Sequence, residues 1–119
     1  MNTELKTKWL AALRSGEYTQ TSGSLRDNDG HCCLGVLCDV IDHTAWVDDF
    51  DESDDKVSSY FQLPTRYNPN NGTVGGYFDH DQLELLGITS VVQSKAMSMN
   101  DSKDFDFNAI ADYLEENLA

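Results

Sequence analysis

The residue types most capable of chemistry gather between positions 31 and 43, which hold His31, Cys32, Cys33, Cys38 and His43. A structural zinc site needs four ligands, usually supplied as two closely spaced pairs. Here Cys32 and Cys33 are adjacent and no second pair follows, so the spacing does not predict a metal site. An odd number of cysteines also excludes a complete set of disulfides within one chain. We therefore expect buried, structural thiols.

The same segment is also compatible with a nucleophilic thiol. Gly30-His31-Cys32-Cys33 would place a thiol at the N-terminus of an apolar helix. At such a position the helix dipole lowers the pKa of a thiol, and backbone N–H groups can hold an oxyanion. Papain-like hydrolases combine this arrangement with a histidine later in the chain, and His80 could serve as that base. Cys32 or Cys33 with His80 therefore defines an alternative function, a small cysteine-dependent hydrolase or transferase.

A second concentration of chemistry is acidic. Six of the eight residues from Asp48 to Asp55 are acids, and Trp46 and Phe50 are interleaved with them. A ladder of carboxylates can imitate DNA phosphates, which lie roughly 6–7 Å apart along a strand, and aromatic residues can anchor a protein interface. The alternative interpretation is a solvated acidic loop. The predicted partner-binding residues are Trp46, Asp48, Asp49, Phe50, Asp51, Glu52, Asp54 and Asp55.

Composition limits the partners. The chain has 119 residues, with 8 basic and 21 acidic side chains and a net charge of −13. This charge disfavours direct contact with nucleic acid or an anionic membrane, because both are polyanions. No apolar run approaches the ~20 residues that span a bilayer, and residues 1–9 lack a secretory signal. We expect a single cytoplasmic domain over residues 1–119 that binds a protein with a basic surface and needs no cofactor. The oligomeric state stays open.

The elements that must position these residues begin with two helices. Apolar spacing predicts an N-terminal helix over residues 3–15, with Thr3 as its cap and Gly16 ending it. Residues 31–41 are apolar over a wide arc, which is typical of the central, most buried helix of a small domain. The β-branched residues Val36, Val40 and Ile41 are also compatible with a strand over part of this segment. Within that segment, Gly35 would allow close approach of another backbone.

Three further helices are expected in the second half of the chain. Asp81 could cap a short helix that Gly87 ends, and Ser90 could cap another. The clearest amphipathic pattern covers residues 107–118, with Asp106 as its N-cap.

The strand signals are weaker. Residues 17–26 tolerate a short strand and are followed by a strong turn signal. Asn71-Gly72 is typical of a two-residue hairpin turn and predicts a hairpin over residues 67–78. Together with the helices, these signals predict an α+β fold with N-terminal, central buried and C-terminal helices and a short antiparallel hairpin.

Two stretches of the chain resemble a known group of proteins. The first consists of residues 8–16, Gly23-Ser-Leu-Arg26 and the string Cys32-Cys-Leu-Gly-Val-Leu-Cys-Asp39. The second consists of Met99-Asn-Asp101 and residues 107–118. Together they resemble a widespread group of small uncharacterised proteins of bacteriophages and prophage-bearing bacteria. The resemblance covers about half of the chain and leaves residues 42–95 unmatched. The resemblance implies an intracellular, phage-borne accessory protein but no activity. In that setting the acidic run predicts an inhibitor of a host defence or nucleic-acid-binding protein that acts by DNA mimicry.

Overall fold

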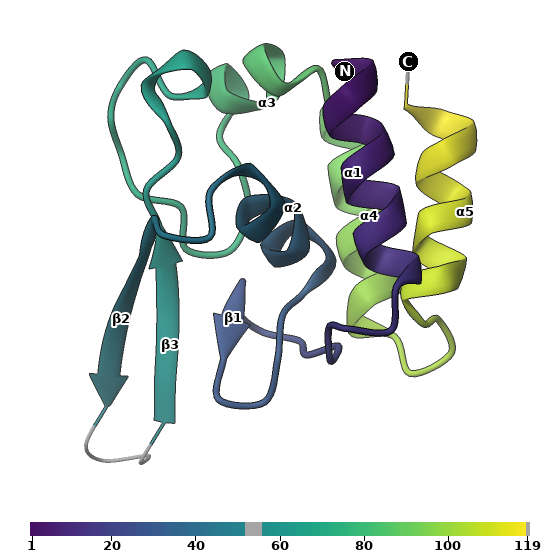
Figure 1. Cartoon of the computed structure of the whole chain (residues 1–119), viewed down its shortest axis with the longest axis horizontal. Helices are drawn as coiled ribbons and strands as arrows, with labels where there is room; N and C mark the ends of the chain where they lie inside the picture. Colours follow the sequence, from purple (N-terminus) through teal and green to yellow (C-terminus); the bar gives the residue numbers. More distant parts are fainter. Residues whose placement is uncertain (52–55, 119) are drawn as a thin grey trace.

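The computed structural model describes residues 1–51 and 56–118, and in this part of the chain five α-helices accompany a three-stranded antiparallel sheet (Figure 1). The predicted α+β class is confirmed. In chain order the elements are α1 (Thr3–Arg14), β1 (Arg26–Asp27), α2 (Cys33–Ile41), β2 (Trp46–Asp51), β3 (Lys56–Phe61), the 3-10 helix η1 (Thr65–Tyr67), α3 (His80–Leu86), α4 (Ser90–Asp101) and α5 (Phe107–Asn117).

The helices α1, α4 and α5 form one side of the molecule (Figure 1). Their apolar stripes face inward, and Leu13 and Ile110 are almost completely buried between them. Arg14 of α1 adds an exposed ion pair to Asp112 of α5, at 2.8 Å. The α5 helix begins as predicted, because the side chain of Asp106 accepts a hydrogen bond from the Ala109 N–H. None of the helices in the described ranges is long and apolar enough to span a bilayer.

Three other helix starts differ from the prediction by one or two residues. In each case an earlier side chain accepts a hydrogen bond from the backbone N–H three residues on, and so satisfies a donor that the first turn leaves open. The observed N-cap of α1 is Asn2 and not Thr3, that of α3 is Asp79 and not Asp81, and that of α4 is Thr89 and not Ser90. Gly87 ends α3 in the left-handed conformation, as predicted.

The central helix α2 lies between the helical side and the sheet (Figure 1). Its residues Cys33–Cys38 are all buried. Gly35 lies against the backbone carbonyl of Leu25, which occupies the space that a Cβ atom would need. The predicted close approach at this glycine is therefore confirmed. From the other side, the indole Nε1 of Trp9 donates a hydrogen bond to the Cys33 carbonyl at 2.9 Å.

The hairpin lies elsewhere than predicted. The sheet order is β1-β3-β2, and residues 46–51 of β2 pair with residues 56–61 of β3, so that β2 holds part of the acidic segment. The hairpin predicted over residues 67–78 is wrong, because only Val74 of that segment makes a bridge, to Phe61. The buried amide of Asn68 explains the difference. It donates to the carbonyls of Leu63 and Gly72, so a side chain and not a strand ladder organises this loop.

Candidate functional site

Successive side chains of β2 and β3 point to opposite sides of the hairpin, which therefore has an outer and an inner face. We call Val47, Asp49, Ser58 and Tyr60 the outer face. Val47 and Tyr60 are cross-strand partners and are 52% and 40% exposed, respectively. Asp49 is two residues further along β2, opposite Ser58, and is also exposed. The outer face therefore combines an exposed apolar pair with a solvated carboxylate.

Trp46 lies on the inner face. Its ring meets the ring of Phe61 edge-on, with 5.1 Å between centroids, and the guanidinium of Arg26 lies 4.5 Å from its ring centroid. Its Nε1 donates a hydrogen bond to Asp39 Oδ1 at 3.0 Å. These contacts attach the first residue of β2 to the body of the protein. The partner-binding role predicted for Trp46 stays a prediction, but its side chain already has internal partners.

Asp48 also faces inward, toward β1. Its Oδ1 accepts hydrogen bonds from Ser59 Oγ at 2.7 Å and from Arg26 Nη2 at 2.8 Å. The Ser59 hydroxyl and the Arg26 guanidinium hold the pKa of Asp48 below its usual range. Because Asp48 and Asp49 occupy opposite faces, they do not form a single ladder of carboxylates.

A polar cluster beneath the hairpin was not foreseen from the sequence. The Tyr18 hydroxyl donates to Asp39 Oδ2 at 2.6 Å, so Asp39 holds both Tyr18 and Trp46. Burial and this hydrogen bond raise the pKa of Tyr18. His31 lies edge-on between the same two rings, with centroid distances of 5.0 and 5.8 Å. We call Tyr18, Arg26, His31 and Asp39 the brace, because they join the hairpin to the body.

His31 is the unusual member of the brace. Its Nε2 atom is buried and has no hydrogen-bond partner among the described residues. Burial lowers the pKa of His31, with a further lowering from the nearby positive charge of Arg26, although the carboxylates of Asp39 and Asp27 oppose it. The neutral imidazole is therefore the favoured form at pH 7.

The remaining predicted binding residues are described only in part. The backbones of Phe50 and Asp51 belong to β2 and pair with Val57 and Lys56. The other three predicted positions, Glu52, Asp54 and Asp55, lie outside the described residues.

The three thiols are fully buried, as expected for structural cysteines. Cys32 caps α2, and its sulfur accepts a hydrogen bond from the Gly35 N–H at 3.4 Å. Burial raises the pKa of Cys32 to about 11 and raises that of Cys33 and Cys38 as well. Cys32 lies at the helix N-terminus, as the hydrolase alternative requires. The burial that raises its pKa outweighs the lowering by the backbone N–H groups of Gly35 and Leu34.

The proposed base, His80, forms no hydrogen bond with the thiols among the described residues. His80 is an exposed residue at the start of α3. Two of the thiols form hydrogen bonds with backbone atoms instead. The Gly35 N–H donates to Cys32 Sγ, and Cys33 Sγ donates to the Ala96 carbonyl. The described residues therefore show no accessible thiolate beside a base, which is what the hydrolase alternative requires.

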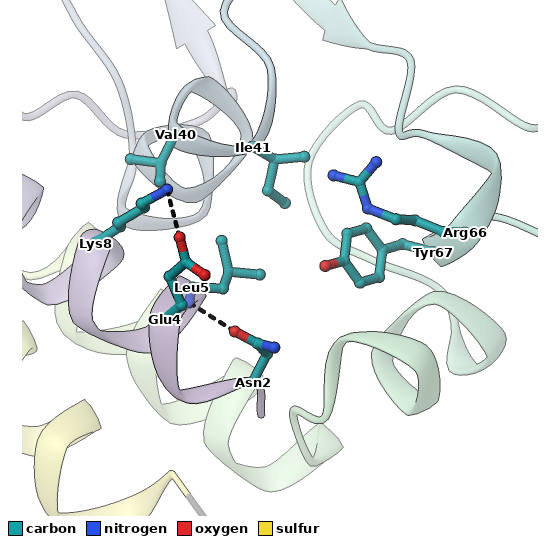
Figure 2. Close-up of a pocket in the computed structure, with 8 residues that line it drawn as sticks. All are labelled: Asn2, Glu4, Leu5, Lys8, Val40, Ile41, Arg66 and Tyr67. Carbon is teal, nitrogen blue, oxygen red and sulfur yellow. Dashed lines mark hydrogen bonds and ion pairs between the residues drawn. The ribbon is translucent and has the colours of Figure 1, made fainter.

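A separate hollow of about 250 Å³ lies between the start of α1, the end of α2 and η1 (Figure 2). Lys8 lines one side of it and forms an exposed ion pair with Glu4 at 3.1 Å. On the opposite side, the guanidinium of Arg66 lies 4.9 Å from the ring centroid of Tyr67 (Figure 2). Because Glu4 offsets Lys8, a single exposed arginine remains, and that does not define a ligand site. Within residues 1–51 and 56–118, no group of three or more His, Cys, Asp or Glu side chains is placed to hold a metal ion.

Comparison with known proteins places the chain without assigning it an activity. A family model described as "Domain of unknown function (DUF8296)" matches residues 1–118. No curated protein and no solved structure matches the chain. The site must therefore be interpreted from its own geometry.

Proposed function

The chain belongs to the DUF8296 family, and we propose that it is a non-enzymatic protein-binding module that docks a basic partner on the outer face of its β2–β3 hairpin. The observation that carries the proposal is the exposed Val47–Tyr60 pair beside the carboxylate of Asp49.

Each part of the outer face has a physical role in this proposal. A tyrosine in the middle of an interface supplies a large apolar area together with a hydroxyl, and such residues often dominate binding energy. A carboxylate and a net charge of −13 attract a basic surface over a long range and speed association. The brace contributes rigidity, because Trp46 and Asp48 are held from below by Asp39 and Arg26.

The partner class follows from charge and setting. The resemblance to phage proteins implies an accessory protein inside a bacterial cell, so the proposed partner is a host protein with a basic, nucleic-acid-binding surface. DNA mimicry is the proposed way of inhibiting it. Residues two apart on a strand lie about 6.7 Å from each other, close to the roughly 6–7 Å spacing of phosphates along DNA. Asp49 and Asp51 are two residues apart in β2, whereas Asp48 lies on the opposite face and forms an ion pair with Arg26 at 2.8 Å.

Affinity capture from a bacterial lysate with two matched variants tests this function. Val47→Ser with Asp49→Asn changes the outer face, and Val91→Ser with Glu116→Gln makes comparable changes on α4 and α5. Val91 is 74% exposed and Glu116 is exposed, so neither control change disturbs the core. We expect a protein that wild type and control retain, that the outer-face variant loses, and that elutes as salt rises. Equal retention by both variants would contradict the proposal.

A further inference from the structure

The strand β2 forms one edge of the sheet. The order β1-β3-β2 leaves its outer side without a neighbouring strand among the described residues, and Figure 1 shows it at the outer margin of the molecule. An edge strand carries unpaired backbone N–H and C=O groups, which are a template for pairing with another chain.

The register shows which backbone groups are available. Phe61 of β3 exchanges both of its backbone hydrogen bonds with Val74, at 2.9 and 2.8 Å, so its polar groups point away from β2. Trp46 is the residue opposite Phe61, and the two form a non-hydrogen-bonded pair. The N–H and C=O of Trp46 therefore point to the free edge. Because the pattern alternates, those of Asp48 do so as well.

The side chains beside this edge determine which strand would fit. A strand added to β2 would place alternate residues about 5 Å from Val47 and Asp49 on the outer face. An apolar residue fits beside Val47, and a lysine or arginine fits beside Asp49. A second copy of the same edge would instead bring the carboxylates of Asp48 and Asp49 against like charges, which is unfavourable.

Resting on the proposed function, we propose that the free edge of β2 receives an extended basic segment of the protein partner as an additional antiparallel strand. Backbone hydrogen bonds to Trp46 and Asp48 hold the segment. Val47 and Asp49, which share the outer face, select an apolar and a basic side chain two residues apart in it. Such strand addition derives affinity from the main chain and specificity from alternate side chains.

Two variants of one residue isolate the backbone contribution. Asp48→Ala and Asp48→Pro both remove the carboxylate and its contacts with Arg26 and Ser59. Only proline also removes the N–H at the free edge. Because that N–H makes no hydrogen bond to β3, the ladder between β2 and β3 keeps its bonds, and edge strands tolerate proline at such a position. Thermal melts of the two variants establish that both fold.

The probe is the blocked peptide Thr-Lys-Thr-Val-Thr-Lys, titrated by NMR against the full chain. In an antiparallel strand its first lysine lies beside Asp49 and its valine beside Val47. We expect it to shift the amide signals of β2, with Asp48→Pro binding about tenfold or more weakly than Asp48→Ala, as the loss of a backbone hydrogen bond predicts. A peptide N-methylated at the threonine opposite Asp48, or at the one opposite Trp46, should bind more weakly to a similar degree. It tests the same backbone pairing if Asp48→Pro does not fold. A peptide with glutamate in place of both lysines should not bind.

The outcomes separate this inference from the function on which it rests. Equal binding by Asp48→Pro and Asp48→Ala, together with unchanged binding of the N-methylated peptides, would overturn strand addition. If Val47→Ser with Asp49→Asn still abolished lysate capture in that case, docking on the outer face would stand. An absence of peptide binding to wild type would also overturn strand addition.

Discussion

The hairpin β2–β3 and the helix α2 both concentrate reactive residue types, yet the fold treats them in opposite ways. In α2 the three thiols are completely buried, and burial raises their pKa values. In the hairpin, Asp49 stays exposed beside Val47 and Tyr60. The comparison shows that residue type defines a chemical capacity, whereas burial decides whether the group can meet another molecule.

The two regions also differ in what stabilises them. The apolar side chains in the first six residues of α2, among them Leu37 and Val36, are fully buried in the core. The hairpin is attached by hydrogen bonds and ring contacts of the brace, chiefly those of Asp39 and Arg26. Changes in α2 should therefore act on stability, and changes on the outer face of the hairpin should act on binding.

The largest expected effect concerns thiol reactivity. A buried thiol reacts only when the structure opens, and the thiol form dominates far above neutral pH when the pKa is about 11, as for Cys32. We expect all three cysteines to react with a thiol reagent at pH 7 at least about a thousandfold more slowly in the native protein than in urea. Rapid native labelling of Cys32, with loss of activity in a folded Cys32→Ser variant, would revive the hydrolase alternative.

The next effect compares one apolar truncation in each region. Leu37→Ala should lower the free energy of unfolding by about 2–5 kcal/mol, because Leu37 is fully buried. Val47→Ala should change it by less than about 0.5 kcal/mol, because Val47 is 52% exposed. Urea denaturation measures both values. Similar costs at the two positions would show that the hairpin is part of the core and not a presented surface.

A smaller effect distinguishes the inner from the outer face of the hairpin. Trp46→Phe keeps a ring but loses the hydrogen bond to Asp39, and it should cost about 1 kcal/mol of stability. Tyr60→Phe on the outer face removes a hydroxyl that forms no hydrogen bond with the described residues. The stability of this variant should therefore equal that of wild type. Urea denaturation again provides the measurement. An unchanged stability of Trp46→Phe would contradict the stabilising role of the brace.

The smallest effect is a pH dependence. Because burial lowers the pKa of His31 in the folded state, the unfolded state binds more protons as pH falls below about 6.5. Stability should therefore be complete above that pH and decline as pH falls toward the lowered pKa of His31. Asp48, whose pKa is lowered as well, contributes only near pH 4 and below. His31→Gln should flatten the decline between pH 6.5 and 5, and an unaltered pH profile in thermal melts would contradict this role.

The helices could be predicted from the sequence because their signals are local. The apolar repeat and the Asp106 cap define α5 within a dozen residues, and the wide apolar arc of α2 indicates burial. The caps were misplaced by one or two residues, because neighbouring polar residues such as Thr89 and Ser90 compete for the same role.

The hairpin and its brace could not be predicted in the same way. The strand β2 consists mainly of aspartates and aromatic residues, so it lacks the apolar alternation that marks a half-buried strand. Its inner face depends on Arg26 and Asp39, which reach Asp48 and Trp46 only in the folded chain. Contacts between distant residues leave no periodic signal, which is why the acidic segment was also compatible with a solvated loop.

The central claim is that a basic partner binds the outer face through charge and a small apolar patch. Its most direct test is the association rate of wild type and Asp49→Asn with the captured partner, measured from low salt to 0.5 M NaCl. We expect association to slow as salt screens the attraction, over a Debye length of ~8 Å at physiological salt, while dissociation changes little. Asp49→Asn should associate more slowly at low salt and depend less on salt. If Asp49→Asn had the wild-type rate and the wild-type salt dependence, the outer face of the hairpin would not be the binding surface.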